Sequence, residues 1–160
     1  SSTMKGRVDQ KEDTVMQALP HNYVVAASQE ENKISLQSPG LQPIDSAAPA
    51  EFGGPGDLWS PETLLTAAIA DCFILSFKAI ATASKFSYMQ LSCDVEAILD
   101  RVDRVTRFTE VTIKPHLTID SSDHQSTGDK LLHKAETTCL ITNSLTATIN
   151  FLPAISIEEG

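Results

Sequence analysis

Residues 60–84 read SPETLLTAAIADCFILSFKAIATAS and carry the clearest structural signal in the chain. Ser60 is a good N-cap, Pro61 suits the first helical position, and Glu62 complements the helix dipole in the first turn. The residues that follow are mostly Ala, Leu, Ile, Phe and Thr, with few charges. The sequence therefore predicts one long helix that runs to about Ser84.

This predicted helix is apolar on most of its surface. One apolar stripe at helical spacing consists of Leu65, Ala68, Ile69, Cys72, Leu75, Ser76 and Ala79. A helix of this kind is expected to be buried, either in the core or in a subunit interface. Asp71 and Lys78 interrupt the apolar run, so no segment approaches the roughly 20 residues that span a bilayer, and we expect no membrane association.

The remaining elements are shorter. We predict strands at 4–8, 23–27, 33–37, 89–100, 109–119 and 145–151, a long loop at 38–57, a turn at 103–107, a polar loop at 121–128, and a second helix at about 130–140 capped by Asp129. Strands, a long helix, strands, a helix and a strand in that order predict an α+β fold with an antiparallel sheet. The 160 residues are expected to form a single domain, 1–160, with 1–20 partly an N-terminal extension or first strand.

Composition limits the function classes. The net charge of −9 argues against a nucleic-acid or anionic-membrane partner, because such partners need clustered Lys and Arg. The first twenty residues are polar and show no hydrophobic signal core. Three cysteines without a CxxC pair fit reduced thiols better than a disulfide framework. We therefore expect a cytoplasmic protein.

The cysteines are the strongest candidates for chemistry, although each also has a structural interpretation. Cys72 and Cys139 can be small core residues, and Cys93, which shares a strand face with Leu91 and Val95, is best interpreted as core packing. In the functional interpretation, one of Cys72 and Cys139 attacks a peroxide and becomes a sulfenic acid, and the other condenses with it to a disulfide. That reaction requires their Cα atoms to lie within about 7 Å.

A reactive cysteine must be a thiolate, and Cys72 lies in mid-helix, where burial and the neighbouring Asp71 are expected to raise its pKa. A nearby cation is therefore expected. The candidates are Arg7, Lys33, Arg101, Arg104 and Arg107.

The sequence supports the other candidate sites less well than the cysteine pair. The histidines, at 21, 116, 124 and 133, show no metal-like spacing, so no metal site is predicted. A Cys–His hydrolase is a rival hypothesis that needs a histidine within about 3 Å of Cys72. Phe52 and Trp59, beside a Gly-rich loop, are candidates either to line a pocket or to anchor that loop.

Two separated motifs resemble the OsmC/Ohr family (osmotically inducible protein C and organic hydroperoxide resistance protein). Residues 60–73 resemble a signature in which an N/S-P-E-x-L start leads through a small-residue helix to Cys-Phe. Residues 135–139 (AETTC), followed by Asn-Ser-Leu at 143–145 and a strand, resemble the segment of the family's second cysteine. Glu62 and Cys72 are ten residues apart and Cys72 and Cys139 sixty-seven, both as in the family. The predicted order of elements agrees from about Tyr23 to Ile157.

The resemblance implies an intertwined homodimer with antiparallel sheets around a long buried helix and two sites at the interface. It implies a thiol-dependent peroxidase that reduces organic hydroperoxides, with Cys72 peroxidatic, Cys139 resolving and Glu62 paired to an arginine from the N-terminal strands. No cofactor is implied, and the reductant is a lipoyl-type or other thiol. The apolar stripe around Cys72 favours fatty or aromatic hydroperoxides. The rival is an OsmC-like small-molecule-binding or redox-sensing protein without efficient peroxidase activity.

The sequence departs from the family pattern in two places. Leu140 follows the second cysteine where the family usually has Pro, and no Arg lies between residues 23 and 40, which leaves Arg7 or Lys33 for that role. Ten residues of straight helix also place Glu62 about 15 Å from Cys72 and about 280° around the axis. We therefore expect Glu62 to serve the site of the partner chain in a dimer, in what looks like a divergent branch of the family.

Overall fold

The computed structural model describes residues 18–159. The chain divides after Ala47 into two compact units, which are described separately. The predicted strand at 4–8 and the candidate cation Arg7 lie outside the described residues.

The first unit is a three-stranded antiparallel sheet in the order β1 (Ala26–Glu30), β2 (Lys33–Gln37), β3 (Ile44–Ser46). β2 has the predicted bounds, whereas β1 begins three residues later than predicted. A tight turn at Glu31, with φ 49°, fixes the pairing of Glu30 with Lys33 and so sets where β1 lies. β3 and a short 3-10 helix, η1 (Ala50–Phe52), lie inside the segment that was predicted to be a structureless loop.

The second unit contains the long helix α2 (Pro61–Ala83), which confirms the prediction to within one residue. Its start is fixed by local chemistry. The Ser60 hydroxyl accepts a hydrogen bond from the Thr63 backbone N–H at 3.1 Å, and the Thr63 hydroxyl accepts one from the Ser60 N–H at 2.8 Å. These reciprocal bonds satisfy donors that a helix start otherwise leaves free.

The buried stripe of α2 differs from the predicted one. The fully buried residues are Ile69, Phe73, Phe77 and Ala81, and only Ile69 belongs to the predicted stripe. Leu75, from that stripe, is 57% exposed. Because both stripes are apolar, the helical period alone could not select the one that faces the sheet.

The expectation that no segment of the chain is long and apolar enough to span a bilayer was also wrong. The most apolar 18-residue window of α2 has a mean hydropathy of 1.8, so the helix is long and apolar enough to cross a bilayer, and 22% of that window is buried within the chain. Asp71 and Lys78 dilute this hydropathy only slightly. Core helices of soluble folds meet the same criterion.

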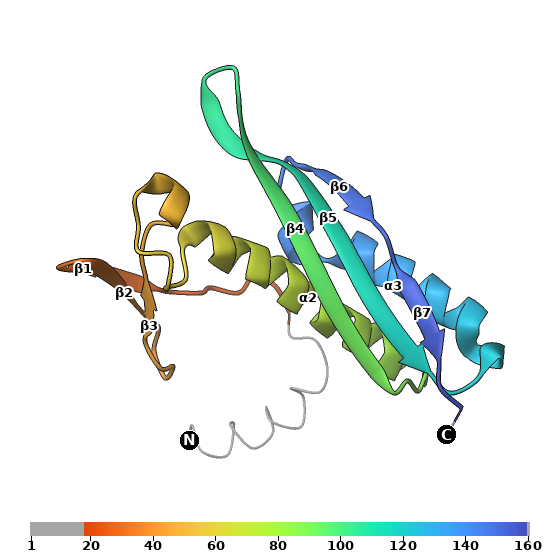
Figure 1. Ribbon diagram of the computed structural model, residues 1–160. Coiled ribbons are helices and arrows are strands. Elements are labelled where there is room, and N and C mark those ends of the chain that lie inside the picture. Colours follow the sequence, from red (N-terminus) through yellow and green to blue (C-terminus); the bar gives the residue numbers. More distant parts are fainter. Residues whose placement is uncertain (1–17, 160) are drawn as a thin grey trace, which may run out of the picture. The chain divides into compact units, whose positions relative to one another are not determined.

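The sheet of the second unit has β5 at its centre. Its strands are β4 (Gln90–Val102), β5 (Val105–Ile119), β6 (Thr148–Phe151) and β7 (Ala154–Ile157). β4 pairs antiparallel with β5, but β6 and β7 pair parallel with it, so the sheet is mixed rather than purely antiparallel. The helical segment between β5 and β6 provides the crossover that a parallel pair requires. Figure 1 shows the β4–β5 hairpin extending well past the other strands.

α3 (Gln125–Thr138) starts five residues before the predicted helix, after the 3-10 turn η2 (Ser122–His124), so the predicted polar loop at 121–128 is largely helical. The predicted cap, Asp129, lies inside α3, and the residue at the N-cap position is His124. Gly128 also lies inside α3, where the lack of a side chain allows close packing. A Cβ added there would lie 3.0 Å from the Leu117 side chain and 3.4 Å from Phe86. The short helix α4 (Leu140–Asn143) follows α3.

The core of this unit lies between the sheet and the helices. α2 and α3 pack against each other and cover one face of the sheet (Figure 1). Phe77 makes edge-to-face contacts with Phe86 and Tyr88 at centroid distances of 6.5 and 5.2 Å. The α+β class predicted from the sequence is confirmed, and the α2–α3 packing holds the two candidate cysteines in place.

Candidate thiol site

The thiols of Cys72 and Cys139 lie together where α2 meets α4. Cys72 is near the middle of α2 and half-buried, whereas Cys139 is fully buried. The two side chains lie within hydrogen-bonding reach of each other, and both cysteines are free. The Cys72 Sγ also lies 3.9 Å from the Ser76 hydroxyl, one turn further along α2. The structure thus brings together the two cysteines that the sequence analysis paired.

Cys139 occupies a break between two helices. Its backbone is extended, with φ −66° and ψ 110°, so it ends α3 and becomes the N-cap of α4. The first backbone bond of α4 runs from the Asn143 N–H to the Cys139 carbonyl at 3.1 Å. The N–H groups of Leu140 and Ile141 precede this bond and are left free of helical partners, so they can donate elsewhere.

These free amides lower the pKa of Cys72. Burial acts to raise it, but hydrogen bonds from the Ile141 amide, the Cys139 thiol, the Ser76 hydroxyl and the Leu140 amide together bring the pKa below the usual value of a thiol. Hydrogen bonds to a charged form favour that form. The expectation that Cys72 would have a raised pKa without a cation was therefore wrong, because it omitted the backbone donors of α4.

Cys139 has the opposite electrostatic character. Burial raises its pKa, hydrogen bonds from Thr142 act against this effect, and the neighbouring Cys72 raises the pKa further. Of the two thiols, Cys72 is therefore the one that ionises first, and Cys139 retains its proton and can donate it in a hydrogen bond. This asymmetry gives the two cysteines different chemical roles.

Cys93 is a third thiol with no sign of reactivity. It lies on β4, half-buried and packed against the core, as predicted. Burial, together with the nearby negative charge of Asp94, raises its pKa to about 12. Cys93 is therefore fully protonated at neutral pH and a poor nucleophile.

The candidate cations do not account for the state of Cys72. Lys33 forms an ion pair with Asp45 at 3.0 Å in the first unit, and this hydrogen bond raises the Lys33 pKa. Within residues 18–159, no Lys or Arg contributes to the lowered pKa of Cys72.

The histidines are engaged elsewhere. His116 contacts the Ser156 hydroxyl, and His124 Nδ1 lies 3.2 Å from Asp120 Oδ1. His133 Nδ1 lies 3.6 Å from Asp129 Oδ1. No histidine in the described part of the chain acts on Cys72. The hydrolase hypothesis therefore gains no support, and the described residues contain no group of three side chains suited to a metal.

Glu62 does not reach Cys72 within one chain. α2 is unbroken between them, so they stay about 15 Å apart along the helix, as expected. Glu62 instead lines a cavity of about 690 Å³, together with Phe52 and Trp59, which confirms that these aromatic residues line a pocket. The Glu62 Oε1 atom is buried and has no hydrogen-bond partner among the described residues.

The comparisons with known proteins agree with this arrangement. A family model described as "OsmC-like protein" matches residues 54–152, which span both cysteines and Glu62. The chain belongs to the OsmC family. It is 25% identical over 115 residues to the uncharacterized protein YmaD of Bacillus subtilis, covering 70% of this chain and 77% of that protein. It is 28% identical over 90 residues to peroxiredoxin OsmC of Escherichia coli, covering 56% of this chain and 62% of that protein.

Solved structures of OsmC proteins share the fold. An organic hydroperoxide resistance protein OsmC from Legionella pneumophila superposes with a TM-score of 0.69 at 26% identity, covering 88% of this chain and all of that one. An OsmC-like protein of unknown function from Vibrio cholerae gives a TM-score of 0.71 at 19% identity, covering 85% and 99%. OsmC relatives thus include proteins named for peroxide chemistry and others with no assigned activity.

Sequence reasoning missed one part of this OsmC-like site, the amide donors of α4. α4 has four residues, which is too short for a helical period of apolar residues to be recognised in the sequence. The available signal was Leu140 itself, because Leu carries the backbone N–H that the Pro usual at this position in the family lacks.

Proposed function

We propose that this OsmC-family chain is a two-cysteine reductase of organic hydroperoxides. The observation that carries the proposal is the asymmetry of the thiol pair. Cys72 is only partly buried and has a lowered pKa, whereas its neighbour Cys139 is fully buried and has a raised pKa. A peroxide can therefore reach the thiolate, and the second thiol is held next to it for the following step.

In the first step the Cys72 thiolate attacks the terminal oxygen of a hydroperoxide. An S–O bond forms as the O–O bond breaks, and the alkoxide leaves as an alcohol after taking up a proton. Cys72 becomes a sulfenic acid. A lowered pKa favours this step because only the thiolate is nucleophilic at neutral pH.

In the second step Cys139 attacks the sulfenic sulfur of Cys72. The S–S bond forms, the sulfenic oxygen leaves as water, and the pair is oxidised to a disulfide. A dithiol of the lipoyl type then reduces this disulfide by thiol exchange and is itself oxidised to a cyclic disulfide. The protein's own residues carry the cycle, without a bound cofactor.

The surroundings of the pair favour hydroperoxides with an apolar body. Leu140 directly follows Cys139 and is 65% exposed. An apolar side chain beside the thiol pair favours an alkyl or aryl group over water-like hydrogen peroxide. This choice agrees with the names of the hydroperoxide resistance proteins that share the fold.

The functional unit is proposed to be a homodimer in the cytoplasm. Only 22% of the most apolar window of α2 is buried within one chain, and Leu75 on this helix is 57% exposed, which is costly for a soluble protein. A second copy packed along α2 would cover this surface. Because Glu62 cannot reach Cys72 of its own chain, the dimer would also let it act at the site of the partner.

Stopped-flow mixing of reduced protein with cumene hydroperoxide tests the proposed activity. Rapid peroxide loss that disappears in Cys72→Ser and persists in Cys93→Ser is expected, since the Cys93 variant changes a thiol of the same unit that lacks the lowered pKa. Peroxide loss no faster in the wild type than in Cys72→Ser would contradict the proposal. That result would favour the rival function, a small-molecule-binding protein, for which the 690 Å³ cavity is the specific observation.

A further inference from the structure

Thr142 is a buried threonine at the third position of α4, three residues after Cys139. Its hydroxyl donates a hydrogen bond to the Cys139 carbonyl at 3.1 Å. Such a bond to the preceding turn is common for a helical threonine and satisfies a buried hydroxyl. The Cys139 thiol is a second acceptor within reach, because the Thr142 hydroxyl and the Thr142 N–H both act on it. The single hydroxyl hydrogen can therefore move between the oxygen and the sulfur of Cys139.

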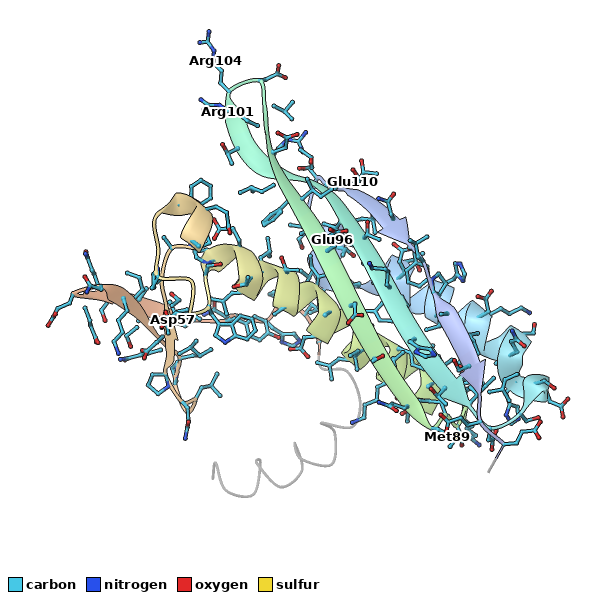
Figure 2. All side chains as sticks on the ribbon, viewed as in Figure 1. Asp57, Met89, Glu96, Arg101, Arg104 and Glu110 are labelled. Carbon is cyan, nitrogen blue, oxygen red and sulfur yellow. The ribbon has the colours of Figure 1, made fainter. Side chains whose placement is uncertain are left out.

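Cys139 needs such a donor in order to ionise. It is fully buried, so water cannot stabilise its thiolate, and no Lys, Arg or His among the described residues acts on it. In Figure 2 the labelled Arg101 and Arg104 lie at the outer end of the β4–β5 hairpin. Arg101 is eight positions along β4 from Cys93, the strand residue that lies near Cys139, which separates them by about 26 Å. The donors that favour the Cys139 thiolate therefore come from α4.

The influences on Cys139 change when Cys72 is oxidised. In the reduced pair Cys72 opposes the ionisation of Cys139, because its negative charge and the hydrogen bond that Cys139 donates to it both raise the Cys139 pKa. The first step converts the Cys72 thiolate to a neutral sulfenic acid, so both effects of the thiolate end. Cys93 on β4 is protonated and adds no charge. Burial then remains as the influence that raises the Cys139 pKa, and the two donors of Thr142 remain as those that lower it.

We propose that the Thr142 hydroxyl is a third catalytic group, beside the two cysteines, and donates its hydrogen to the Cys139 sulfur as this sulfur attacks Cys72. The inference rests on the proposed function, because it assigns a residue to the second step of that reaction. In this step the Cys139 S–H bond breaks, the S–S bond forms and the S–O bond of the sulfenic acid breaks. The leaving hydroxide takes up the Cys139 proton and departs as water. The Thr142 hydroxyl keeps its own hydrogen and stabilises the charge that develops on sulfur.

Single-turnover kinetics with cumene hydroperoxide separate the two steps, because dimedone traps the sulfenic acid and mass spectrometry of quenched samples measures the disulfide. Thr142→Val keeps the shape of the side chain without the hydroxyl. It should slow disulfide formation roughly tenfold and increase the trapped sulfenic acid. Thr142→Ser restores the hydroxyl and should recover most of the rate. Thr138→Val is the matched control and should not change the rate, because Thr138 adjoins Cys139 but its hydroxyl donates to the Lys134 carbonyl at 3.0 Å.

The pH dependence of disulfide formation distinguishes a lost hydrogen bond from a displaced Cys139. The rate in Thr142→Val should approach the wild-type rate as the pH rises, because the Cys139 thiolate then forms without a donor. A displaced Cys139 would instead react slowly at every pH. Disulfide formation at the wild-type rate in Thr142→Val, or a deficit of the same size at every pH, would overturn the inference.

A second measurement does not depend on peroxide chemistry. With Cys72→Ser and Cys93→Ser combined, Cys139 is the only thiol of the chain, and its neighbour on α2 is neutral, as a sulfenic acid is. NMR of isotope-labelled cysteine then follows the ionisation of Cys139, and adding Thr142→Val should raise its pKa. A wild type that forms no sulfenic acid would overturn the proposed function and this inference with it. Normal sulfenic acid formation in the wild type, with a Cys139 pKa that Thr142→Val leaves unchanged, would overturn the inference alone.

Discussion

The backbone N–H of Leu140 faces the thiol of Cys72 across the junction of α2 and α4 and, with the Ile141 amide, acts to lower the pKa of that thiol. Leu140 is the first residue of α4 and directly follows Cys139. The start of α4 therefore carries the second cysteine as its N-cap and helps to ionise the first. This relationship explains how Cys72 can hold a lowered pKa in mid-helix without a neighbouring arginine in the described chain.

Leu140→Pro should raise the pKa of Cys72. Proline is well tolerated at the first position of a helix, so α4 should still form, and the main loss is one N–H donor to the thiolate. The thiolate is the reactive form, so a raised pKa moves the pH profile of Cys72 alkylation by iodoacetamide to higher pH. Leu140→Ala keeps the N–H and should retain the wild-type profile. Identical profiles for Leu140→Pro and the wild type would show that this amide does not act on Cys72.

Cys139→Ala should also move the alkylation profile of Cys72 to higher pH, because it removes the thiol that donates to the Cys72 thiolate. Below the midpoint of the profile, the rate should be lower than in the wild type. Cys139→Ser leaves a hydroxyl donor in place and should lie between the two. A faster alkylation of Cys72 in Cys139→Ala at neutral pH would contradict the assigned roles.

Phe77→Ala should reduce the free energy of unfolding by about 3–5 kcal/mol, the usual effect of truncating a fully buried aromatic residue. Phe77 is completely buried and packs edge-to-face on Phe86 and Tyr88. Urea unfolding followed by circular dichroism measures this. A loss below about 1 kcal/mol would mean that this part of α2 does not face the core as described.

Leu75→Asp should shift the protein from dimer to monomer, as measured by size-exclusion chromatography with light scattering. Leu75 is 57% exposed within one chain, on the stripe of α2 that we propose a second copy covers. The charged group would have to be desolvated in that contact. Thr82→Asp, which places the same charge on an exposed position in the last turn of α2, is the matched control. A dimer that survives Leu75→Asp would place the interface elsewhere.

The elements that the sequence predicted well are those determined by neighbouring residues. α2 was located because Ser60, Pro61 and Glu62 encode its start within three positions, and β2 because its alternation is regular. The pairing of Cys72 with Cys139 came from the family motifs rather than from periodicity.

The features that were missed depend on contacts between distant segments. The buried stripe of α2 was wrongly assigned because α2 is apolar on nearly all sides, so that only its packing against the sheet determines which side is buried. The predicted start of α3 was too late because Asp129 was interpreted as its N-cap, whereas residues 125–128 are already helical and Gly128 accommodates the Leu117 side chain. The parallel pairing of β6 and β7 with β5, and the donation from α4 to Cys72, depend on how the chain returns to the sheet after α3.

Disulfide mapping after a single turnover tests the central claim most directly. Reduced protein is treated with one equivalent of cumene hydroperoxide, the remaining thiols are blocked, and the peptides are identified by mass spectrometry. The account predicts a disulfide between Cys72 and Cys139 of one chain, with Cys93 recovered as a blocked thiol. A disulfide that includes Cys93, or a Cys72 that accumulates as sulfinic acid while Cys139 stays reduced, would contradict it.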